Sequence, residues 1–252
     1  EEEALKKANA SDPSETSPTP SQALTQQIIS RSLYFLTHES PVIRARILIL
    51  LSLAVPVLPE SSLLPSVHSA WPFILNRLAD AETFVVSAAA NLVDVLATEV
   101  GSFMYRRIWD DVWPRFQVIL RQLEKGDKSS ALARRSRTAV GTESAYTHSH
   151  RLYRSLIRTM AAVLRGVHPH EPSFWECLLL FKRFLGQNVH EELQACAKQL
   201  YIAAGKRNAD AVWLVLSGTV DEIGVPLRFM HDDQWGIELN AREILHSLEY
   251  VV

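Results

Sequence analysis

The sequence predicts an all-α protein, an α-solenoid built from HEAT-like antiparallel helix pairs. Apolar residues recur at helical intervals along successive segments, and short polar turns separate these segments. Only 9 of the 252 residues are glycine, about half the average frequency, which favours helices over a turn-rich β-sandwich. Because 47% of the residues are hydrophobic, the chain can bury enough apolar surface to fold.

Residues 1–20 are predicted to form a disordered linker or tail, because prolines stand there among Ser, Thr, Glu and Lys. The solenoid is expected over residues 21–220. Its first helix begins at Ser21, which can act as the cap. The second begins at Ser40-Pro41, where proline suits the first helical turn.

The next segments also follow helical spacing, with Asn208 as a candidate cap for the last of them. Between two of these helices lies a polar stretch at about 125–143, which we interpret as a flexible charged insertion, because such long loops are rare within compact folds. The expected helices span about 63–78, 83–100, 103–123, 146–164, 174–185, 189–204 and 209–217.

An internal repeat supports the solenoid. Trp71-Pro72 recurs as Trp113-Pro114, a shift of 42 residues, and each pair lies in the first helix of its unit. This period falls within the range of about 40–47 residues that is typical of HEAT and armadillo repeats. Proline is expected to kink the outer helices, and small residues let the inner ones approach closely. The same shift carries Ile43, Ile47, Leu50 and Ala54 onto Val85, Ala89, Leu92 and Leu96.

The sequence contains none of the common catalytic or cofactor motifs. Glycine-rich phosphate loops, paired-cysteine metal knuckles and nucleophile elbows are all missing. The histidine pairs His148/His150 and His168/His170 are interpreted as solvated loop residues rather than metal ligands. We therefore expect a protein that is not an enzyme and that binds no metal or cofactor.

Charge argues against a nucleic-acid or membrane partner. The chain has 26 basic and 28 acidic residues, a formal net charge of −2, whereas binding to polyanions needs a marked positive excess. A local alternative lies in the insertion, where Arg134, Arg135 and Arg137 form a cluster that could contact an anion. A transport or nucleic-acid-associated HEAT adaptor is thus the alternative function.

The tail, residues 221–252, is predicted to end in a short helix that Asn240 caps. Its apolar residues do not follow clean helical spacing throughout, and a solenoid normally ends in a polar face. The tail therefore either folds back as a cap or docks on another chain. Its candidate partner-binding residues are Phe229, Met230, Trp235, Ile237, Ile244 and Leu248.

Cysteine content and hydropathy bear on location. Cys177 and Cys196 lie in helical patterns and are interpreted as free thiols, not as a disulfide framework. No signal peptide is expected, and the longest apolar stretch, at 47–58, is far shorter than the ~20 residues that span a bilayer. We predict a cytoplasmic protein, with the nucleus as a second location.

One stretch resembles a known family. The segment from Leu63 to Pro72 begins with Leu-Leu-Pro, ends with Trp-Pro and precedes an alanine-rich helix that stops near Gly101 and Phe103. It resembles the C-terminal HEAT region of the large scaffold subunit of the Triple T (TTT) co-chaperone complex. The resemblance covers roughly residues 21–220 and continues through Trp113-Pro114.

This resemblance implies a non-catalytic scaffold. Members of the family hold the other two TTT subunits, and the complex supports maturation of phosphatidylinositol-3-kinase-related kinases (PIKKs) with the Hsp-ninety chaperone and its AAA-ATPase adaptor. No catalytic residue is carried over, because the family has none. A solenoid suits such a role, since it exposes long surfaces for large interfaces.

Overall fold

The computed structural model describes residues 18–129, 148–217 and 236–249. These ranges contain helices and no strand, which confirms the all-α prediction. The helices are α2 (Pro20–Ser32), α3 (Pro41–Ala54), α4 (Glu60–Arg77), α5 (Thr83–Glu99), α6 (Gly101–Arg106), α7 (Trp113–Ser129), α8 (His148–Gly166), α9 (Glu171–Phe181), α10 (Glu191–Gly205), α11 (Ala209–Ser217) and α12 (Glu238–Glu249). Three short helical segments join them: η1 (Leu33–Thr37), η2 (Arg107–Val112) and η3 (Lys182–Leu185).

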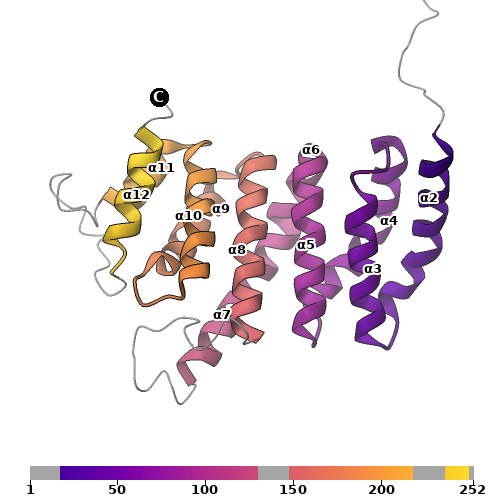
Figure 1. Cartoon of the computed structure of the whole chain (residues 1–252), viewed down its shortest axis with the longest axis horizontal. Coiled ribbons are helices and arrows are strands. Elements are labelled where there is room, and N and C mark those ends of the chain that lie inside the picture. Colours follow the sequence, from indigo (N-terminus) through magenta and orange to yellow (C-terminus); the bar gives the residue numbers. More distant parts are fainter. Residues whose placement is uncertain (1–17, 130–147, 218–235, 250–252) are drawn as a thin grey trace, which may run out of the picture.

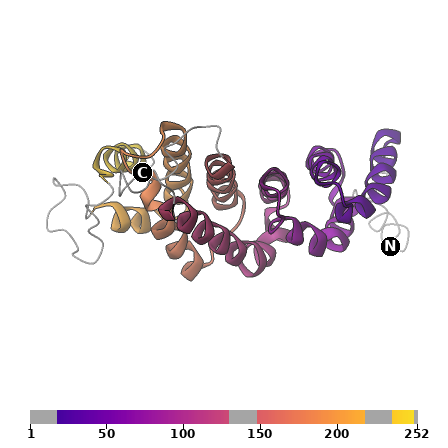
Figure 2. The same ribbon diagram turned by 90° about the horizontal axis from the view of Figure 1, so that it is seen from below.

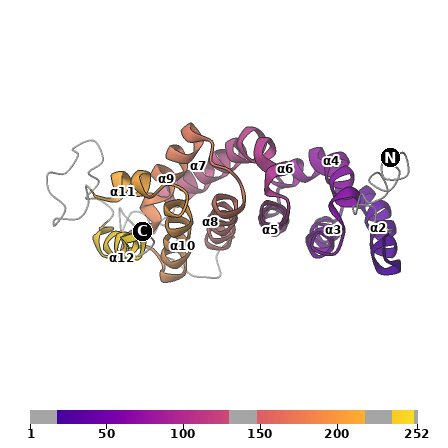
Figure 3. The same cartoon turned by 90° about the horizontal axis from the view of Figure 1, so that it is seen from above.

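The helices stack in two rows, as an α-solenoid does (Figure 1). Helices α3, α5, α8, α10 and α12 form the inner row, in which α5 packs on α3, α8 on α5, and α10 on α8. Helices α4, α6 with α7, α9 and α11 form the outer row, and α2 covers the end beside α3 (Figure 1). The rows follow a shallow arc, with the inner row on its hollow side (Figures 2 and 3).

The 42-residue repeat is present in the structure. Helix α3 begins at Pro41 and α5 at Thr83, which are 42 residues apart. Ile43, Ile47 and Leu50 are only half-buried, although their counterparts in α5 are fully buried. Ala54 is buried like its counterpart Leu96. Leu48 and Leu51 of α3 and the following Val55 are also buried, and the same shift carries them onto the buried Ala90, Val93 and Ala97.

One predicted helix start is wrong and another is confirmed. Helix α2 is capped by Thr19 rather than Ser21: the Gln22 backbone N–H donates to Thr19 Oγ1, and the Gln22 side chain accepts from the Thr19 N–H. Pro20 then occupies the first helical turn, where its missing N–H costs nothing. The prediction for α11 is confirmed, because Asn208 Oδ1 accepts from the Ala211 N–H at 2.9 Å.

The outer helix that runs from α6 to α7 is interrupted. Its middle segment, η2, is π-helical and directly precedes Trp113-Pro114. Pro114 has no N–H to donate to the carbonyl four residues earlier, and a π-helical turn accommodates that gap. Helix α7 then continues to Ser129, several residues into the stretch predicted to be a loop from about residue 125.

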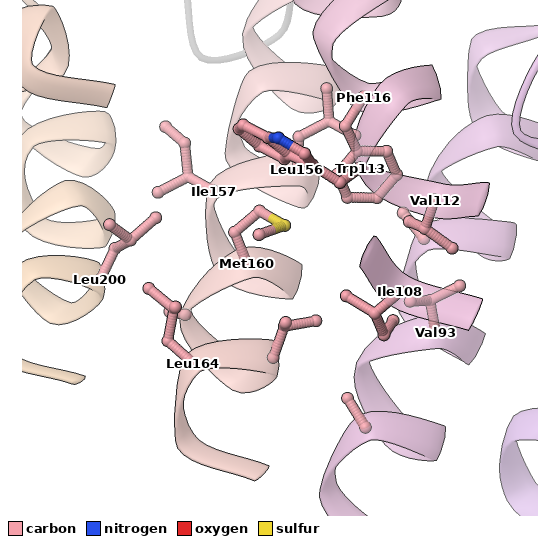
Figure 4. Packing of buried hydrophobic residues seen from close by; sticks show 14 of the residues in the cluster. Val93, Ile108, Val112, Trp113, Phe116, Leu156, Ile157, Met160, Leu164 and Leu200 are labelled. Atoms are coloured by element: carbon pink, nitrogen blue, oxygen red, sulfur yellow. The ribbon is translucent and has the colours of Figure 1, made fainter. Parts of the chain in front are cut away.

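Helix α8 is the centre of the core. Its buried side chains Leu156, Met160 and Leu164 lie between the outer-row residues Ile108 and Trp113 on one side and helix α10 on the other (Figure 4). Alanines 88–90 of α5 are also buried, which lets α5 and α8 approach closely. The buried Thr159 hydroxyl donates to the Ala90 carbonyl at 3.0 Å and so fixes the register of the two helices.

Indole N–H groups link consecutive units of the outer row. Trp71 Nε1 donates to Asp111 Oδ2 at 2.8 Å, and Trp113 Nε1 donates to Glu176 Oε2 at 3.1 Å. The two tryptophans of the sequence repeat thus make the same kind of bond, each to a carboxylate of the next outer element. Burying an indole requires a partner for its N–H, and here that requirement ties neighbouring units together.

An ion-pair cluster joins α3 to the turn between α4 and α5. The Arg44 guanidinium donates from both Nε and Nη2 to the Asp80 carboxylate, at 2.9 and 2.8 Å, and Arg77 donates to the same carboxylate at 3.0 Å. Burial alone would raise the pKa of Asp80, but the bonds from Arg44 and from the Glu82 N–H outweigh it and hold that pKa below its ordinary value.

Two glycines allow the backbones of α6, α8 and α5 to touch. A Cβ on Gly101 would lie 2.0 Å from the Gly166 carbonyl oxygen, and a Cβ on Gly166 would lie 2.0 Å from the Ala97 carbonyl oxygen. Both obstacles are backbone atoms, so no side-chain rotation relieves them. Gly126, in contrast, is exposed in α7 and has nothing within 4 Å of such a Cβ.

Gly101→Ala and Gly166→Ala should each lower the free energy of unfolding by about 2 kcal/mol or more, because a methyl group would force the packed backbones apart. Gly126→Ala is the matched control and should raise it by roughly 0.5–1 kcal/mol, because alanine loses less backbone entropy in a helix. Urea denaturation measures all three variants. Equal effects at the three positions would contradict the close approach.

Asp80→Asn should lower the free energy of unfolding at neutral pH by about 2 kcal/mol, because it removes the charge of a carboxylate that accepts hydrogen bonds from two partly exposed arginines. The folded pKa of Asp80 is lowered, so its stabilisation is complete above its unfolded pKa of about 3.9 and is lost as pH falls through the folded pKa. The difference between wild type and variant should therefore shrink below about pH 4. The exposed Asp110→Asn is the control and should change stability by less than about 0.5 kcal/mol.

Candidate protein-interaction surface

A row of arginines runs along the inner face of α8. Arg151, Arg154, Arg158 and Arg165 are three, four and seven residues apart, so they lie on one stripe of the helix. At 1.5 Å per residue the stripe is about 21 Å long. We call this surface, together with the grooves on its two sides, the α8 groove.

The α8 groove has two connected halves. Between α5 and α8 is a depression of about 360 Å³, lined among others by Phe84, Asn91 and Arg158. Between α8 and α10 is one of about 380 Å³, lined among others by Arg165 and Cys196. Asp94, Arg154 and Arg158 border both halves, so the two depressions form one continuous surface around α8.

The arginines of the α8 groove are only partly neutralised. Arg154 forms an ion pair with Glu192 of α10. Arg151, Arg158 and Arg165 have no carboxylate within ion-pair distance among the residues that the structure describes. Burial raises the pKa of the nearby Asp94 carboxyl, even though Arg158 and Arg165 act to lower it. The groove therefore offers a positive surface within a chain whose net charge is −2.

Apolar side chains adjoin this positive surface. Phe84 is 43% exposed and lines the same depression as the arginines. By the 42-residue shift, Val42 and Ile49 hold the positions in α3 that Phe84 and Asn91 hold in α5. Both are exposed, Val42 by 56%, so the apolar surface extends along the inner face toward α3. Exposed apolar residues next to charged ones are characteristic of interaction surfaces.

Part of the predicted tail site lies in the chain's own core. Ile237, Ile244 and Leu248 are buried, and helix α12 packs against α10 and α11. Leu248 fits against Gly205, where a Cβ would lie 2.5 Å from its two methyl groups. The first of the two alternatives for the tail therefore holds for residues 236–249, which fold back and cap the stack. Phe229, Met230 and Trp235 lie outside the described residues.

The prediction that Asn240 caps the final helix is wrong. Helix α12 begins earlier, at Glu238, and Asn240 is buried within it. Its side-chain amide donates to the Leu185 carbonyl and to Gln194 Oε1, both at 2.7 Å. These bonds attach α12 to the end of η3 and to α10.

The arginines predicted to contact an anion, Arg134, Arg135 and Arg137, also lie outside the described residues, within 130–147. The arginines of α8 are not among the residues predicted from the sequence, although their spacing of three, four and seven residues is visible there. A charged helical stripe is usually just a solvated face, and only the position of α8 in the middle of the inner row distinguishes this one.

The interpretation of His150 as a solvated loop residue was wrong. Its ring is buried at the start of α8, and its Nε2 lies 3.0 Å from Glu192 Oε2. His150, His190 and Glu192 offer atoms within 4.8 Å of one another, close enough for a metal ion. However, His190 Nδ1 accepts a hydrogen bond from the Glu192 backbone N–H. The Glu192 carboxylate is already hydrogen-bonded to His150 and Arg154. The cluster thus acts as a hydrogen-bonded link between α8 and α10. His168 and His170 are exposed, as expected.

The two cysteines are free thiols, as predicted. Cys177 is fully buried, and burial raises its pKa far above the ordinary value. Cys196 is half-buried in the α8 groove, and its pKa is also raised, chiefly by burial. Neither thiol has the lowered pKa of a nucleophile.

These features define a helical-repeat protein with a long, mixed polar and apolar inner surface. A family model described as the TTI1 C-terminal TPR domain matches residues 1–213, and the chain belongs to this family. None of the described helices combines the length with the hydropathy that a membrane span requires.

Two curated relatives carry the same description, "TELO2-interacting protein 1 homolog". The mouse protein is 22% identical over 202 residues, which cover 77% of this chain and 17% of the relative. The human protein is 24% identical over 219 residues, which cover 82% of this chain and 18% of the relative. The chain thus spans less than a fifth of the length of either relative. The resemblance to the TTT scaffold family is therefore confirmed.

The family description uses the term TPR, whereas the sequence predicts HEAT-like pairs. Both are stacks of antiparallel helix pairs, and they differ in period, about 34 residues for TPR and about 40–47 for HEAT. The observed spacing between the starts of α3 and α5 is 42 residues, and prolines lie inside the outer helix α4. In these two respects the chain follows the HEAT pattern.

Ile244→Ala should lower the free energy of unfolding by about 3 kcal/mol, because it leaves a cavity beneath α12. Leu239→Ala is the matched control on the same helix. Leu239 is 58% exposed, so its truncation should cost less than about 0.5 kcal/mol. Thermal denaturation and limited proteolysis after α11 measure both variants. If the two variants behaved alike, α12 would not be docked as described.

Proposed function

We propose that the chain is the C-terminal part of a non-catalytic scaffold subunit of a TTT co-chaperone complex. The observation that carries the proposal is the family match over residues 1–213, together with relatives named as TELO2-interacting proteins. A stacked array of helix pairs suits this role, because it offers extended surfaces and binds by area rather than by reactive groups.

The partners that we propose follow from the family. The first is the TELO2-type subunit, which the relatives' names identify as their partner. The second is the remaining TTT subunit, and the complete complex then acts on PIKKs with the Hsp-ninety system. This work would take place in the cytoplasm and in the nucleus.

The end of the stack formed by α2, η1 and α4 supports a continuation of the solenoid. A depression of about 530 Å³ lies there, lined among others by Leu33, Tyr34, Pro65 and Phe73. Tyr34 is 83% exposed, and Phe73 is also exposed. Internal repeats bury such faces against their neighbours. Because the relatives are more than five times as long as the matched region, we propose that preceding helix pairs cover this end.

The complete 252-residue chain, co-expressed with the TELO2-type protein and the third TTT subunit of the same organism, should co-purify with at least one of them. A mass of one-to-one stoichiometry by light scattering is the expected result, because dedicated scaffold interfaces are large and specific. Gly101→Ala provides the control, since a distorted stack should lose the complex.

A correctly folded monomer that ignores both subunits would contradict the scaffold role of this region. Salt-dependent binding to nucleic acid, abolished by replacing Arg134, Arg135 and Arg137 with Ser, would favour the alternative adaptor function instead.

A further inference from the structure

We propose that the α8 groove binds an acidic amphipathic helix of a partner protein. This inference rests on the proposed scaffold function, because it identifies one surface by which such a scaffold would hold a partner. It assigns a role to a surface that the packing of the solenoid leaves unexplained.

The charge of the groove selects for an acidic occupant. Among the described residues that line the two depressions, four arginines stand against two carboxylates, Asp94 and Glu192, and Glu192 is already shared by Arg154 and His150. Arg151 and Arg158 therefore keep their charges available to a ligand, and planar guanidinium groups bind carboxylates in a bidentate manner.

The apolar side of the groove selects for an amphipathic occupant. Phe84 borders the same depression as Arg151 and Arg158, and the exposed Val42 and Ile49 continue that side toward α3. A purely acidic segment would leave these side chains in water. A segment with leucine-like anchors on one side and carboxylates on the other would cover both kinds of surface.

The form of the inner face favours a helix over an extended peptide. The lining residues belong to helices, whose backbone groups are bonded internally, and no strand edge occurs in the described ranges. An extended segment would leave its own N–H and C=O groups without partners there, whereas a helix satisfies them itself. About 14 residues of helix would match the 21 Å of the arginine stripe.

Nucleic acid fits this surface less well. The carboxylates of Asp94 and Glu192 would repel phosphates, and Phe84 is the only aromatic residue among those lining the two described depressions. Single-stranded nucleic acid usually binds where several aromatic side chains can stack with bases. The net charge of −2 also gives no general attraction for a polyanion.

Cys196 provides a built-in reporter of occupancy. It is half-buried in the α10 side of the groove, whereas Cys177 is fully buried in the core. Alkylation at pH 8.5 should therefore modify Cys196 in the free chain and leave Cys177 unmodified. An occupant of the groove should slow the reaction of Cys196.

The first experiment uses the complete chain with three probes: an 18-residue leucine–glutamate amphipathic helix, its leucine–lysine counterpart and a 20-nucleotide single-stranded RNA. The acidic helix should bind most tightly and protect Cys196. Arg151→Gln/Arg158→Gln should weaken its binding by about tenfold or more, and Phe84→Ser by about fivefold. The control Arg106→Gln/Arg121→Gln makes the same charge change at exposed positions of the outer row and should bind normally.

The second experiment repeats the alkylation in the complex with the other TTT subunits. Protection of Cys196 that is lost with Arg151→Gln/Arg158→Gln would support the proposal. It is overturned if the acidic helix binds no better than its lysine counterpart, if the two double variants behave alike, or if only the RNA binds. Failure of the complex to form would count against the scaffold function, while the acidic helix would still test the groove independently.

Discussion

The packing of α5 against α8 is the contact on which the rest of the fold depends. Residues 130–147 stand between α7 and α8 in the sequence, so no short turn links the two halves of the inner row, and tertiary packing has to hold them together. The buried alanines 88–90 allow the close approach, and the bond from Thr159 to the Ala90 carbonyl sets the register. Everything from α8 onward takes its position from this interface.

The outer row reinforces the same junction with polar bonds. Trp109 Nε1 in η2 donates to the His168 carbonyl at 2.8 Å, and Trp113 Nε1 at the start of α7 donates to Glu176 Oε2, so two indoles of the outer row bind the segment that follows α8. The glycine contact between α6 and α8 brings backbone against backbone at one end of the junction. Apolar burial supplies the free energy of stacking, and these bonds specify the geometry, since apolar burial has no direction.

The features that the sequence predicted are those that depend on local chemistry and period. Pro41 marks the start of one helix, and Asn208 caps another. The stacked helix pairs are predicted because the Trp-Pro pair and the apolar pattern recur with the same shift of 42 residues. The errors arose where two local solutions compete or where tertiary contacts decide. Ser21 and Thr19 are both capable caps, and Asn240 is drawn into a helix by partners from distant segments. His150 is buried because α10 lies beside it, which no local pattern indicates.

The α8 groove escaped prediction for the same reason, and its energetics separate binding from folding. Beneath the groove, Leu156, Met160 and Leu164 bury their side chains and stabilise the stack. On its surface, an unpaired arginine contributes little to folding, because exposed charges interact weakly in water. An exposed Phe84 likewise gains nothing from the chain's own core. Side chains that do not stabilise the fold, yet gather on its hollow side, acquire an energetic role only when a partner excludes water from them.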